Sequence, residues 1–362
     1  MSRRLGSSLA QDLRPCVGLL IAALAVAGHF APSARADSLA TFYQGKDIKL
    51  LISGTVGGGY DIYARTLAKH LGAHIPGHPA VIPQNMPAAG GLAAANYTYN
   101  VAPRDGTVIC LLQNTVALEP FYANKQAQFD AAKLSWLGTP TTEVAVYLVW
   151  HTSKIRTLQD AQTFEMITGG AGAASTPVFY ARVFNQIFGM KARLITGYPG
   201  QNELLLALEN GEVEAMSSPF WSSIKTSRPN WYPQAKIRFL FQYGAEPHSE
   251  LKDVPFALNL LRNKADKVLL IAASAPLGLG RPFVAPPGIP ADRLAALRAA
   301  MTATFNDDAE FRADCEKQRL ECNNPKTGAQ IETLITQAYA TPEDIRKRLI
   351  DIYQLGPGAE NK

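Results

Sequence analysis

The sequence predicts an α/β protein of two domains, each a mostly parallel sheet flanked by helices. A chain of 362 residues is long enough for two domains of ordinary size. Strand, loop and helix patterns alternate in residues 48–112 and again in residues 144–241, which indicates parallel strands covered by helices. A composition of 47% hydrophobic and 18% charged residues is that of a globular protein.

The most informative stretch is residues 48–71, in which a predicted strand, a loop and a helix follow one another. Residues 48–53 are an apolar run that predicts a buried strand, and a loop with three consecutive glycines, residues 57–59, follows it. Apolar residues then recur at spacings of three and four up to Ile75, which predicts a helix. The free N–H groups at the start of such a helix favour a bound anion. A tight turn without a ligand is the alternative interpretation.

The same pattern recurs along the first half of the chain. Residues 80–82 and 107–112 predict two more strands, and residues 92–99 predict a helix. A second glycine loop, residues 84–91, precedes that helix. In a parallel sheet both glycine loops lie at the carboxyl ends of strands, where α/β proteins bind ligands.

A third loop of small residues lies in the middle of the chain. Residues 165–168 predict a strand, and the loop of residues 169–177 leads into a helix that extends to Phe188. Ser175 or Thr176 is a suitable N-cap for this helix, with Pro177 at its first helical position. Further elements are predicted as strands at 144–149, 191–196, 213–216 and 238–241, and as helices at 201–209 and from 219–221 onward.

The C-terminal part predicts helices almost throughout. After a proline-rich connector at residues 286–290, helical patterns cover residues 291–305, 308–318, 328–339 and 342–353. Such a helical tail needs a surface to cover, and we expect it to pack back onto the first sheet.

The first 36 residues have the pattern of a secretory signal peptide. Arginines precede an apolar run at residues 17–27, and residues 34–36 read Ala-Arg-Ala, so we expect export to the periplasm and cleavage after Ala36. We favour the ordinary secretory route over the twin-arginine route. Residues 1–36 hold four arginines and one aspartate, which leaves 31 basic and 29 acidic residues in the mature chain. That balance gives no argument for nucleic-acid binding.

Three cysteines remain in the mature chain. Cys110 lies in an apolar run and is expected to be a buried, inert thiol. Cys315 and Cys322 lie seven residues apart across a predicted helix end. In an oxidising compartment they either pair as a disulfide or stay free, and the sequence leaves both open.

Metal and enzyme interpretations are disfavoured. His70, His74 and His78 have a four-residue spacing, but Pro76 and Gly77 end the helix before His78 and no cysteine or aspartate nearby completes a ligand set. The chain has no Gly-x-Ser-x-Gly elbow, no His-Glu-x-x-His, no P-loop lysine and no dinucleotide fingerprint. We therefore predict a binding protein without metal or cofactor, and not an enzyme.

Short motifs recur in an order that resembles one family. They are Gly-Gly-Gly-Tyr-Asp at 57–61, Gln-Asn-Met-Pro-Ala-Ala-Gly at 84–90, Ala-Pro-Arg-Asp-Gly at 102–106, Gly-Tyr-Pro-Gly at 197–200, Asn-Gly-Glu-Val at 210–213, Arg-Pro-Phe at 281–283 and Pro-Pro-Gly at 286–288. The set resembles the solute receptors of tripartite tricarboxylate transporters, the TctC or Bug family of periplasmic binding proteins. The resemblance covers residues 40–355.

This resemblance implies a type II periplasmic binding protein, the two-domain venus-flytrap fold. Domain 1 is expected to comprise residues 37–145 and 279–362, and domain 2 residues 146–278. A small organic carboxylate is expected to bind between the domains, and a monomeric receptor to deliver it to the membrane subunits of a transporter. A sensor that presents the closed form to a signalling partner is the alternative, and a secreted enzyme is less favoured.

The loops and the resemblance together predict a ligand-binding set. It comprises Gly57, Gly58, Gly59, Tyr60, Asp61, Ala89, Gly90, Gly91, Gly172, Ala174, Ser175, Thr176 and Tyr198. Asp61 either accepts a ligand hydrogen bond or only stabilises the helix start. Tyr60 either faces the cleft or packs on the neighbouring loop, and Tyr198 either closes the cleft or belongs to a plain turn. Ser217, Ser218 and Trp221 face either the cleft or the hinge.

Overall fold

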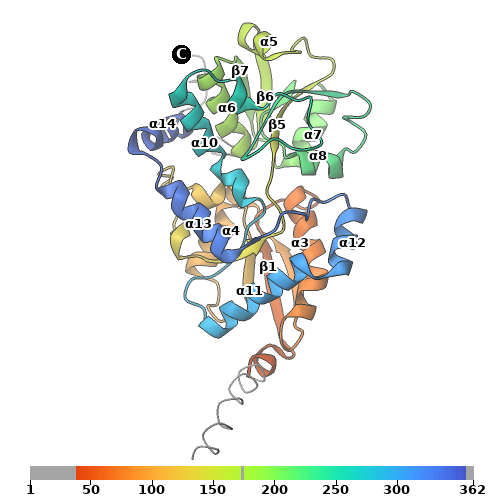
Figure 1. Ribbon diagram of the computed structural model, residues 1–362, viewed down its shortest axis with the longest axis vertical. Coiled ribbons are helices and arrows are strands. Elements are labelled where there is room, and N and C mark those ends of the chain that lie inside the picture. Colours follow the sequence, from red (N-terminus) through yellow and green to blue (C-terminus); the bar gives the residue numbers. More distant parts are fainter. Residues whose placement is uncertain (1–37, 173–174, 356–362) are drawn as a thin grey trace, which may run out of the picture.

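A computed structural model describes residues 38–172 and 175–355 and shows two α/β units (Figure 1), between which the chain crosses twice near the cleft and once more between its last two helices. The chain passes to the second unit between β4 (Ser135–Thr139) and β5 (Ala145–Trp150). It returns to the first unit between α10 (Lys264–Leu279) and β10 (Phe283–Ala285). The predicted domain boundaries fall at or near these crossings, and the exact extents of the domains stay a prediction.

The sheet of the first unit has the strand order β11-β4-β10-β3-β1-β2. Strand β1 (Asp47–Ile52) lies between β2 (Ala80–Asn85) and β3 (Val108–Leu111) and runs parallel to both. Its side chains from Leu50 to Ile52 are buried, as expected for a strand that is covered on both faces. Strand β11 (Lys326–Thr327), at the far edge, comes from the C-terminal part of the chain.

Both predicted glycine loops lead from a strand into a helix. Helix α3 (Gly59–His70) follows β1, and α4 (Leu92–Asn100) follows β2 after the 3-10 turn η2 (Ala88–Gly91). The apolar side of α3 packs against the first sheet through Ala64 and Leu67. Because parallel strands end at the same edge of a sheet, the two loops lie together, and both face the space between the units.

The sheet of the second unit has the order β7-β6-β8-β5-β9. Strand β6 (Met166–Gly170) runs parallel to β7 (Ala192–Thr196) and β8 (Ala215–Met216). Helix α6 (Thr176–Phe188) follows β6, and α7 (Gln201–Glu209) follows β7. The strand-to-helix pattern of the first unit is therefore repeated here.

Each sheet is mixed, whereas the sequence predicted mostly parallel strands. Strand β10 runs antiparallel to β3 and β4, and β5 runs antiparallel to β8 and β9 (Ile237–Tyr243). The reason is that β4, β5 and β10 border the crossings between the units, where no helix returns the chain to the same edge of its sheet. The elements β4, α5 (Leu158–Thr163), α9 (Ala257–Leu260) and α10 were also absent from the prediction.

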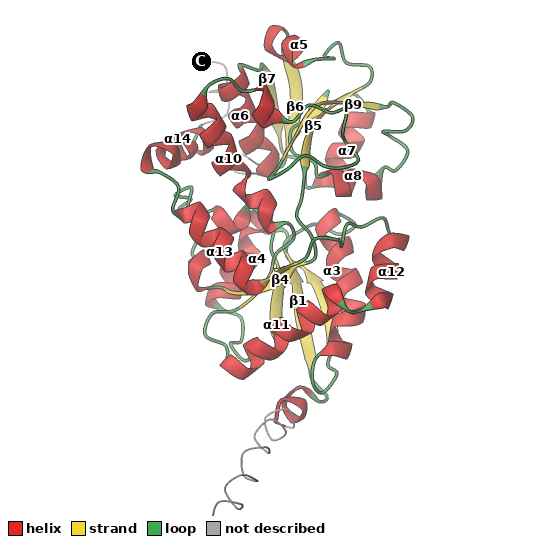
Figure 2. Ribbon diagram, in the orientation of Figure 1, coloured by secondary structure: helices red, strands yellow, loops and turns green. Residues whose placement is uncertain are grey.

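The C-terminal helices divide between the two units. Helices α11 (Ala291–Asn306) and α13 (Gly328–Tyr339) pack on β4, and α12 (Ala309–Lys317) packs on α3, as predicted for a tail on the first unit. Helix α14 (Glu343–Tyr353) instead lies against α6 and α10 of the second unit (Figure 2). The prediction that the whole tail covers the first unit is therefore wrong for α14.

A buried ion pair ties the two crossings together. Glu143 lies in the first crossing and Arg281 in the second, both side chains are fully buried, and Arg281 Nε lies 2.8 Å from Glu143 Oε1. Arg281 Nη2 also donates to the hydroxyls of Ser222 and Ser223 in α8 (Trp221–Ser227). Its guanidinium lies 4.1 Å from the ring centre of Tyr63 in α3. Arg281 therefore contacts both units at the hinge.

Cysteine chemistry is settled within the described residues. Cys315 and Cys322 form a disulfide, which decides between the two predicted alternatives. Cys110 is buried in β3, and burial raises the pKa of its thiol to about 12, so it is the inert thiol that was expected. No helix in residues 38–172 and 175–355 is long and apolar enough to cross a membrane. The predicted signal peptide lies outside the described residues.

Candidate functional site

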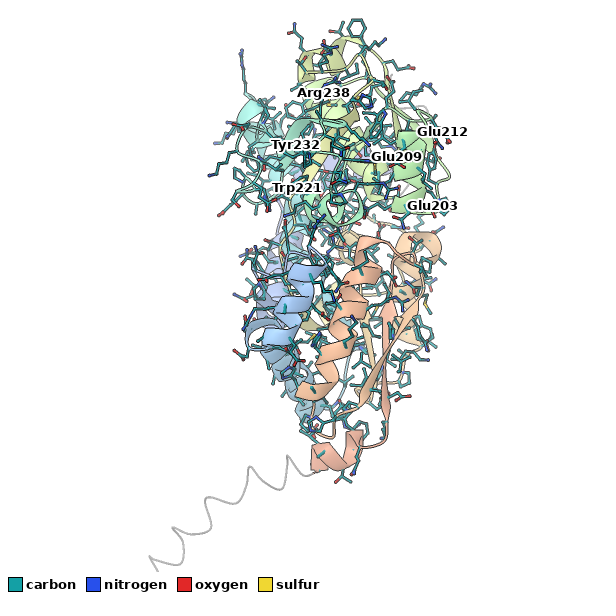
Figure 3. All side chains as sticks on the ribbon, turned by 90° about the vertical axis from the view of Figure 1, so that its right-hand side faces the viewer. Glu203, Glu209, Glu212, Trp221, Tyr232 and Arg238 are labelled. Atoms are coloured by element: carbon teal, nitrogen blue, oxygen red, sulfur yellow. A yellow bond between two sulfur atoms is a disulfide. The ribbon has the colours of Figure 1, made fainter. Side chains whose placement is uncertain are left out.

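A cleft of about 1100 Å³ lies between the two units. The first unit lines it with Gly58, Gly59 and Tyr60 at the start of α3, and the second unit with Ser175 and Thr176 at the start of α6. Figure 3, turned by 90° from Figure 1, shows Glu203 and Trp221 at the edge of the second unit that faces the first. The cleft is large enough for a small organic molecule.

The first glycine loop brings backbone atoms to the cleft. Gly58 is the N-cap of α3 in an extended conformation, and no side chain caps the helix. A Cβ at Gly59 would lie 2.6 Å from Ser223 Oγ of the second unit, so glycine permits this close approach. The ring of Tyr60 lines the cleft, while its hydroxyl donates to Asn114 Oδ1 and accepts from the Asn114 N–H.

Asp61 is not among the residues that line the cleft, and its ligand role stays a prediction. Its carboxylate accepts hydrogen bonds from the Gly57 N–H, Arg65 Nε and Asn85 Nδ2. Burial alone would raise the pKa of Asp61, but these hydrogen bonds outweigh it and the net pKa is lowered. Asp61 therefore holds the glycine loop in place, which is close to the alternative interpretation. Gly57 donates one of these hydrogen bonds and does not line the cleft either.

The second glycine loop has three consecutive left-handed residues. Ala89, Gly90 and Gly91 have φ values of 53°, 67° and 95°. Ala89 and Gly90 line the cleft. Gly91 does not, because it packs against Ser53, whose carbonyl oxygen would lie 2.8 Å from a Cβ there. Gln113 Nε2 donates to the carbonyls of Ser53 and Gly90 and thereby fixes the loop.

The second unit contributes the start of α6. Ser175 is the N-cap, as predicted, and its hydroxyl makes no capping bond. The hydroxyl of Thr176 lies 2.6 Å from that of Thr115 in the first unit, so this pair bridges the two units. Gly172 also lines the cleft. Ala174, another predicted residue, lies outside the described residues.

Tyr198 does not line the cleft, and its neighbours do. Its hydroxyl lies 3.5 Å from Glu212 Oε2, away from the site, whereas Gly200 and Gln201 at the start of α7 are in the lining. A Cβ at Gly200 would lie 2.5 Å from Thr55 Oγ1, so the two units touch here. The small-residue loop at 197–200 was the available signal. Of the predicted stretch at residues 198–200, Pro199 and Gly200 line the cleft and Tyr198 does not.

Sequence reasoning also missed other lining residues. They include Thr55, Thr115, Glu119, Phe220, Ser223 and Tyr353, from loops and helix ends of both units. Ser218 lines the cleft, which decides between its two predicted positions, whereas Ser217 and Trp221 are buried outside the lining. No short motif marks these residues, because the fold brings them together from distant parts of the chain.

Two buried polar atoms at helix starts in the cleft lining have no hydrogen-bond partner, and the same holds for Ser218 Oγ elsewhere in the lining. The first two are Ser175 Oγ and Gln201 Nε2, at the starts of α6 and α7. A buried polar group without a partner costs about 1–3 kcal/mol, so a ligand that pairs with these atoms gains affinity. Both atoms indicate a polar ligand group at this end of the cleft.

The described lining of the cleft offers an anion backbone donors and no basic side chain. Among the described residues that line it there is no Lys, Arg or His. The starts of α3, α4, α6 and α7 instead contribute their free N–H groups and the positive ends of their dipoles. Arg281 lies behind Tyr60, with its guanidinium 4.8 Å from that ring centre, and is paired with Glu143. Such an arrangement suits an anion held by backbone donors.

The histidines of α3 and η1 (Leu71–His74) pair with carboxylates of the C-terminal part. His70 Nε2 lies 3.1 Å from Asp314 Oδ2, and His74 Nε2 lies 2.8 Å from Asp308 Oδ2. The sequence analysis found no aspartate near these histidines. These two are more than 230 residues away along the chain. The predicted absence of a metal stays a prediction.

A second cluster has ligand-type side chains outside the cleft. His248, Glu250 and Glu321 place ligand atoms within 4.8 Å of one another. The Lys225 ammonium lies 2.8 Å from Glu250 and 2.6 Å from Glu321 and supplies the positive charge that the carboxylates need. The cluster is therefore an ion-pair network that joins α8 to the segment after α12.

Comparison with solved structures identifies the fold. MatC from Rhodopseudomonas palustris with bound malate matches with a TM-score of 0.66 and 16% identity, over 86% of this chain and 99% of that one. A Rhodopseudomonas palustris protein with adipate matches with a TM-score of 0.63 and 16% identity, over 84% and 97%. A TctC solute binding protein from Polaromonas, without ligand, matches with a TM-score of 0.58 and 18% identity, over 85% and 99%. The fold is that of a two-domain periplasmic binding protein, as predicted.

The family follows from the sequence itself. The profile of the tripartite tricarboxylate transporter family receptors, TctC, matches residues 63–349. The chain belongs to this family, which confirms the predicted membership. Comparison with curated protein sequences found no match.

Proposed function

We propose that this protein is a periplasmic solute receptor that binds a small carboxylate in the cleft and delivers it to a tripartite tricarboxylate-type transporter. The observation that carries the proposal is the convergence of four helix starts on a cleft that holds unpaired polar atoms at Ser175 and Gln201. Backbone N–H groups at helix starts bind carboxylates without a salt bridge. Family membership and the malate and adipate in similar folds support the same class of ligand.

The proposal extends to how the protein works. A ligand that contacts both units stabilises the closed form, which the membrane subunits then recognise. We propose a monomer, exported by its signal peptide, with no cofactor and no enzymatic step. A binding role needs no nucleophile. The described lining of the cleft contains no histidine, cysteine or lysine.

Thermal unfolding with a panel of mono-, di- and tricarboxylates tests this function. A cognate ligand at a hundredfold its dissociation constant should stabilise the protein by about 2.7 kcal/mol. Gly90→Val should abolish the shift, because Gly90 lines the cleft with open space around it. Gly189→Val is the matched control, since Gly189 has the same φ of 67° and open surroundings but lies outside the cleft lining. A cognate carboxylate that binds the Gly90 variant as tightly as the parent would contradict the proposal.

An uptake experiment distinguishes a transport receptor from a sensor. Deletion of the gene should abolish uptake of the cognate carboxylate when the protein is a receptor. Retained uptake with a lost transcriptional response would instead identify a sensor.

A further inference from the structure

The lining of the cleft contains two chemically different groups of residues, which we treat as its two ends. One end holds the starts of α3, α6 and α7, which lie close together through the contacts of Thr55 with Gly200 and of Thr115 with Thr176. The other end holds Glu119, Asn124 and Tyr353. We name these the anion end and the Glu119 end.

Glu119 is the only acidic side chain among the described residues that line the cleft. It lies one turn beyond Thr115, and only 6% of it is exposed. Its Oε2 accepts hydrogen bonds from Asn124 Nδ2 and from the Tyr353 hydroxyl. Tyr353 is held in turn by stacking on Tyr122, so the Glu119 end is a built polar site.

Burial raises the pKa of Glu119, and the hydrogen bonds from Asn124 and Tyr353 to Oε2 offset only part of that rise because they favour the ionised carboxylate. No lysine, arginine or histidine of the described lining faces this carboxylate. A second carboxylate of a ligand placed at the Glu119 end would therefore meet a like charge without a cation to offset it. A hydroxyl or amide N–H of a ligand would instead find a strong acceptor.

We propose that the ligand carries one carboxylate, held at the anion end, and an uncharged hydrogen-bond donor that binds Glu119 at the other end. This inference rests on the proposed function and narrows it, because it separates hydroxy-monocarboxylates from dicarboxylates of the same length. Glu119 is then the residue that determines specificity, and it acts by attracting a donor and by repelling a second carboxylate.

Calorimetric titration with matched pairs tests the inference without a mutation. The pairs are 4-hydroxybutyrate with succinate, 6-hydroxyhexanoate with adipate, and 4-(hydroxymethyl)benzoate with terephthalate, all at pH 8 because a high pH favours the ionised form of a carboxyl group whose pKa is raised. In the pair that binds, the hydroxy acid should bind about tenfold tighter or more than the diacid. A diacid that binds as tightly or more tightly overturns the inference and leaves the proposed function standing.

The Glu119→Gln variant then tests whether Glu119 causes the preference for the hydroxy acid. The variant keeps the shape of the side chain and removes its charge, so the preference for the hydroxy acid should shrink by about tenfold through tighter diacid binding. Glu165→Gln, an exposed change outside the cleft lining, is the control and should leave the preference unchanged. An unchanged preference in a folded Glu119 variant overturns the role of Glu119. Failure of every carboxylate to bind the wild-type protein would refute the proposed function itself.

Discussion

Gly200 limits how closely the two units approach at the mouth of the cleft. The nearest atoms to a Cβ at this position are Oγ1 and Cγ2 of Thr55, at 2.5 and 3.1 Å. Since both belong to one side chain across the cleft, a single methyl group at Gly200 pushes directly against the other unit. How closely the two units approach at this point therefore depends on two residues, Gly200 and Thr55.

This contact predicts a weakened variant and its rescue. Gly200→Ala should reduce ligand affinity, by about tenfold for a strain of about 1.4 kcal/mol in the closed form. Thr55→Ala removes both clashing atoms, so the double variant should regain most of the affinity. Calorimetric titration of the three variants measures this. Equal affinities of Gly200→Ala and the parent would show that the units need not touch here.

Asp61 predicts a stability effect. Asp61→Ala leaves the Gly57 N–H and Asn85 without their partner, so unfolding should cost about 1–3 kcal/mol less than in the parent at pH 7. Because the folded-state pKa of Asp61 is lowered, its contribution is present above the unfolded value of about 3.9 and is lost as pH falls through the folded value. Denaturation at pH 7 and pH 3 should show the gap shrinking, and a constant gap would contradict this role.

At the scale of elements, the disulfide fixes the segment after α12. Cys322 follows Glu321, whose carboxylate contacts Lys225 Nζ of α8 and whose backbone bonds to the Tyr63 hydroxyl of α3. The loop closed by the disulfide thus holds the Glu321 side chain against α8 of the second unit. Its role is to hold that contact in place rather than to bind the ligand.

Removing this disulfide should have a modest cost. Cys322→Ser opens a loop with a sequence separation of 7, which corresponds to about 2 kcal/mol of stability by loop entropy. Chemical denaturation of the parent with and without reductant should show the same loss, and the serine variant should no longer respond to reductant. Free thiols at both positions in periplasmic material would contradict the disulfide.

The helices show what the sequence reveals and what it hides. The loops before α3, α4 and α6 were predicted because glycine runs and apolar periodicity are local signals. Helix α10 was missed, and it contains Pro276, which cannot donate a helical hydrogen bond. The bond between Glu119 and Tyr353 joins residues 234 positions apart, so no local pattern announces it. Local signals therefore point to the loops that lead into the cleft, whereas Glu119 and Tyr353 enter its lining only through the fold.

At the scale of the whole molecule, the ion pair of Glu143 and Arg281, which we call the hinge pair, connects the two units. Glu143 and Arg281 come from different crossings, and Arg281 reaches α3 and α8. A charge buried this completely is costly once its partner is removed. The pair therefore links the integrity of the hinge to both units at once.

Removal of one member of the hinge pair should cause a large loss of stability, and removal of both members should restore part of it. Glu143→Gln should destabilise the protein by about 3–5 kcal/mol, because Arg281 keeps its charge without a partner. The double variant Glu143→Leu, Arg281→Met should be more stable than either single change, since it leaves no buried charge unpaired. A double-mutant cycle by chemical denaturation measures this. Additive losses would show that the two side chains do not act as a pair.

The central claim is that backbone N–H groups from both units bind one carboxylate in the cleft. Hydrogen–deuterium exchange of the free and ligand-saturated protein measures it most directly. The account predicts slower exchange at the starts of α3 and α4 in the first unit and of α6 and α7 in the second, all in the same complex. Tight carboxylate binding with protection in one unit only, or at none of these helix starts, would contradict the account.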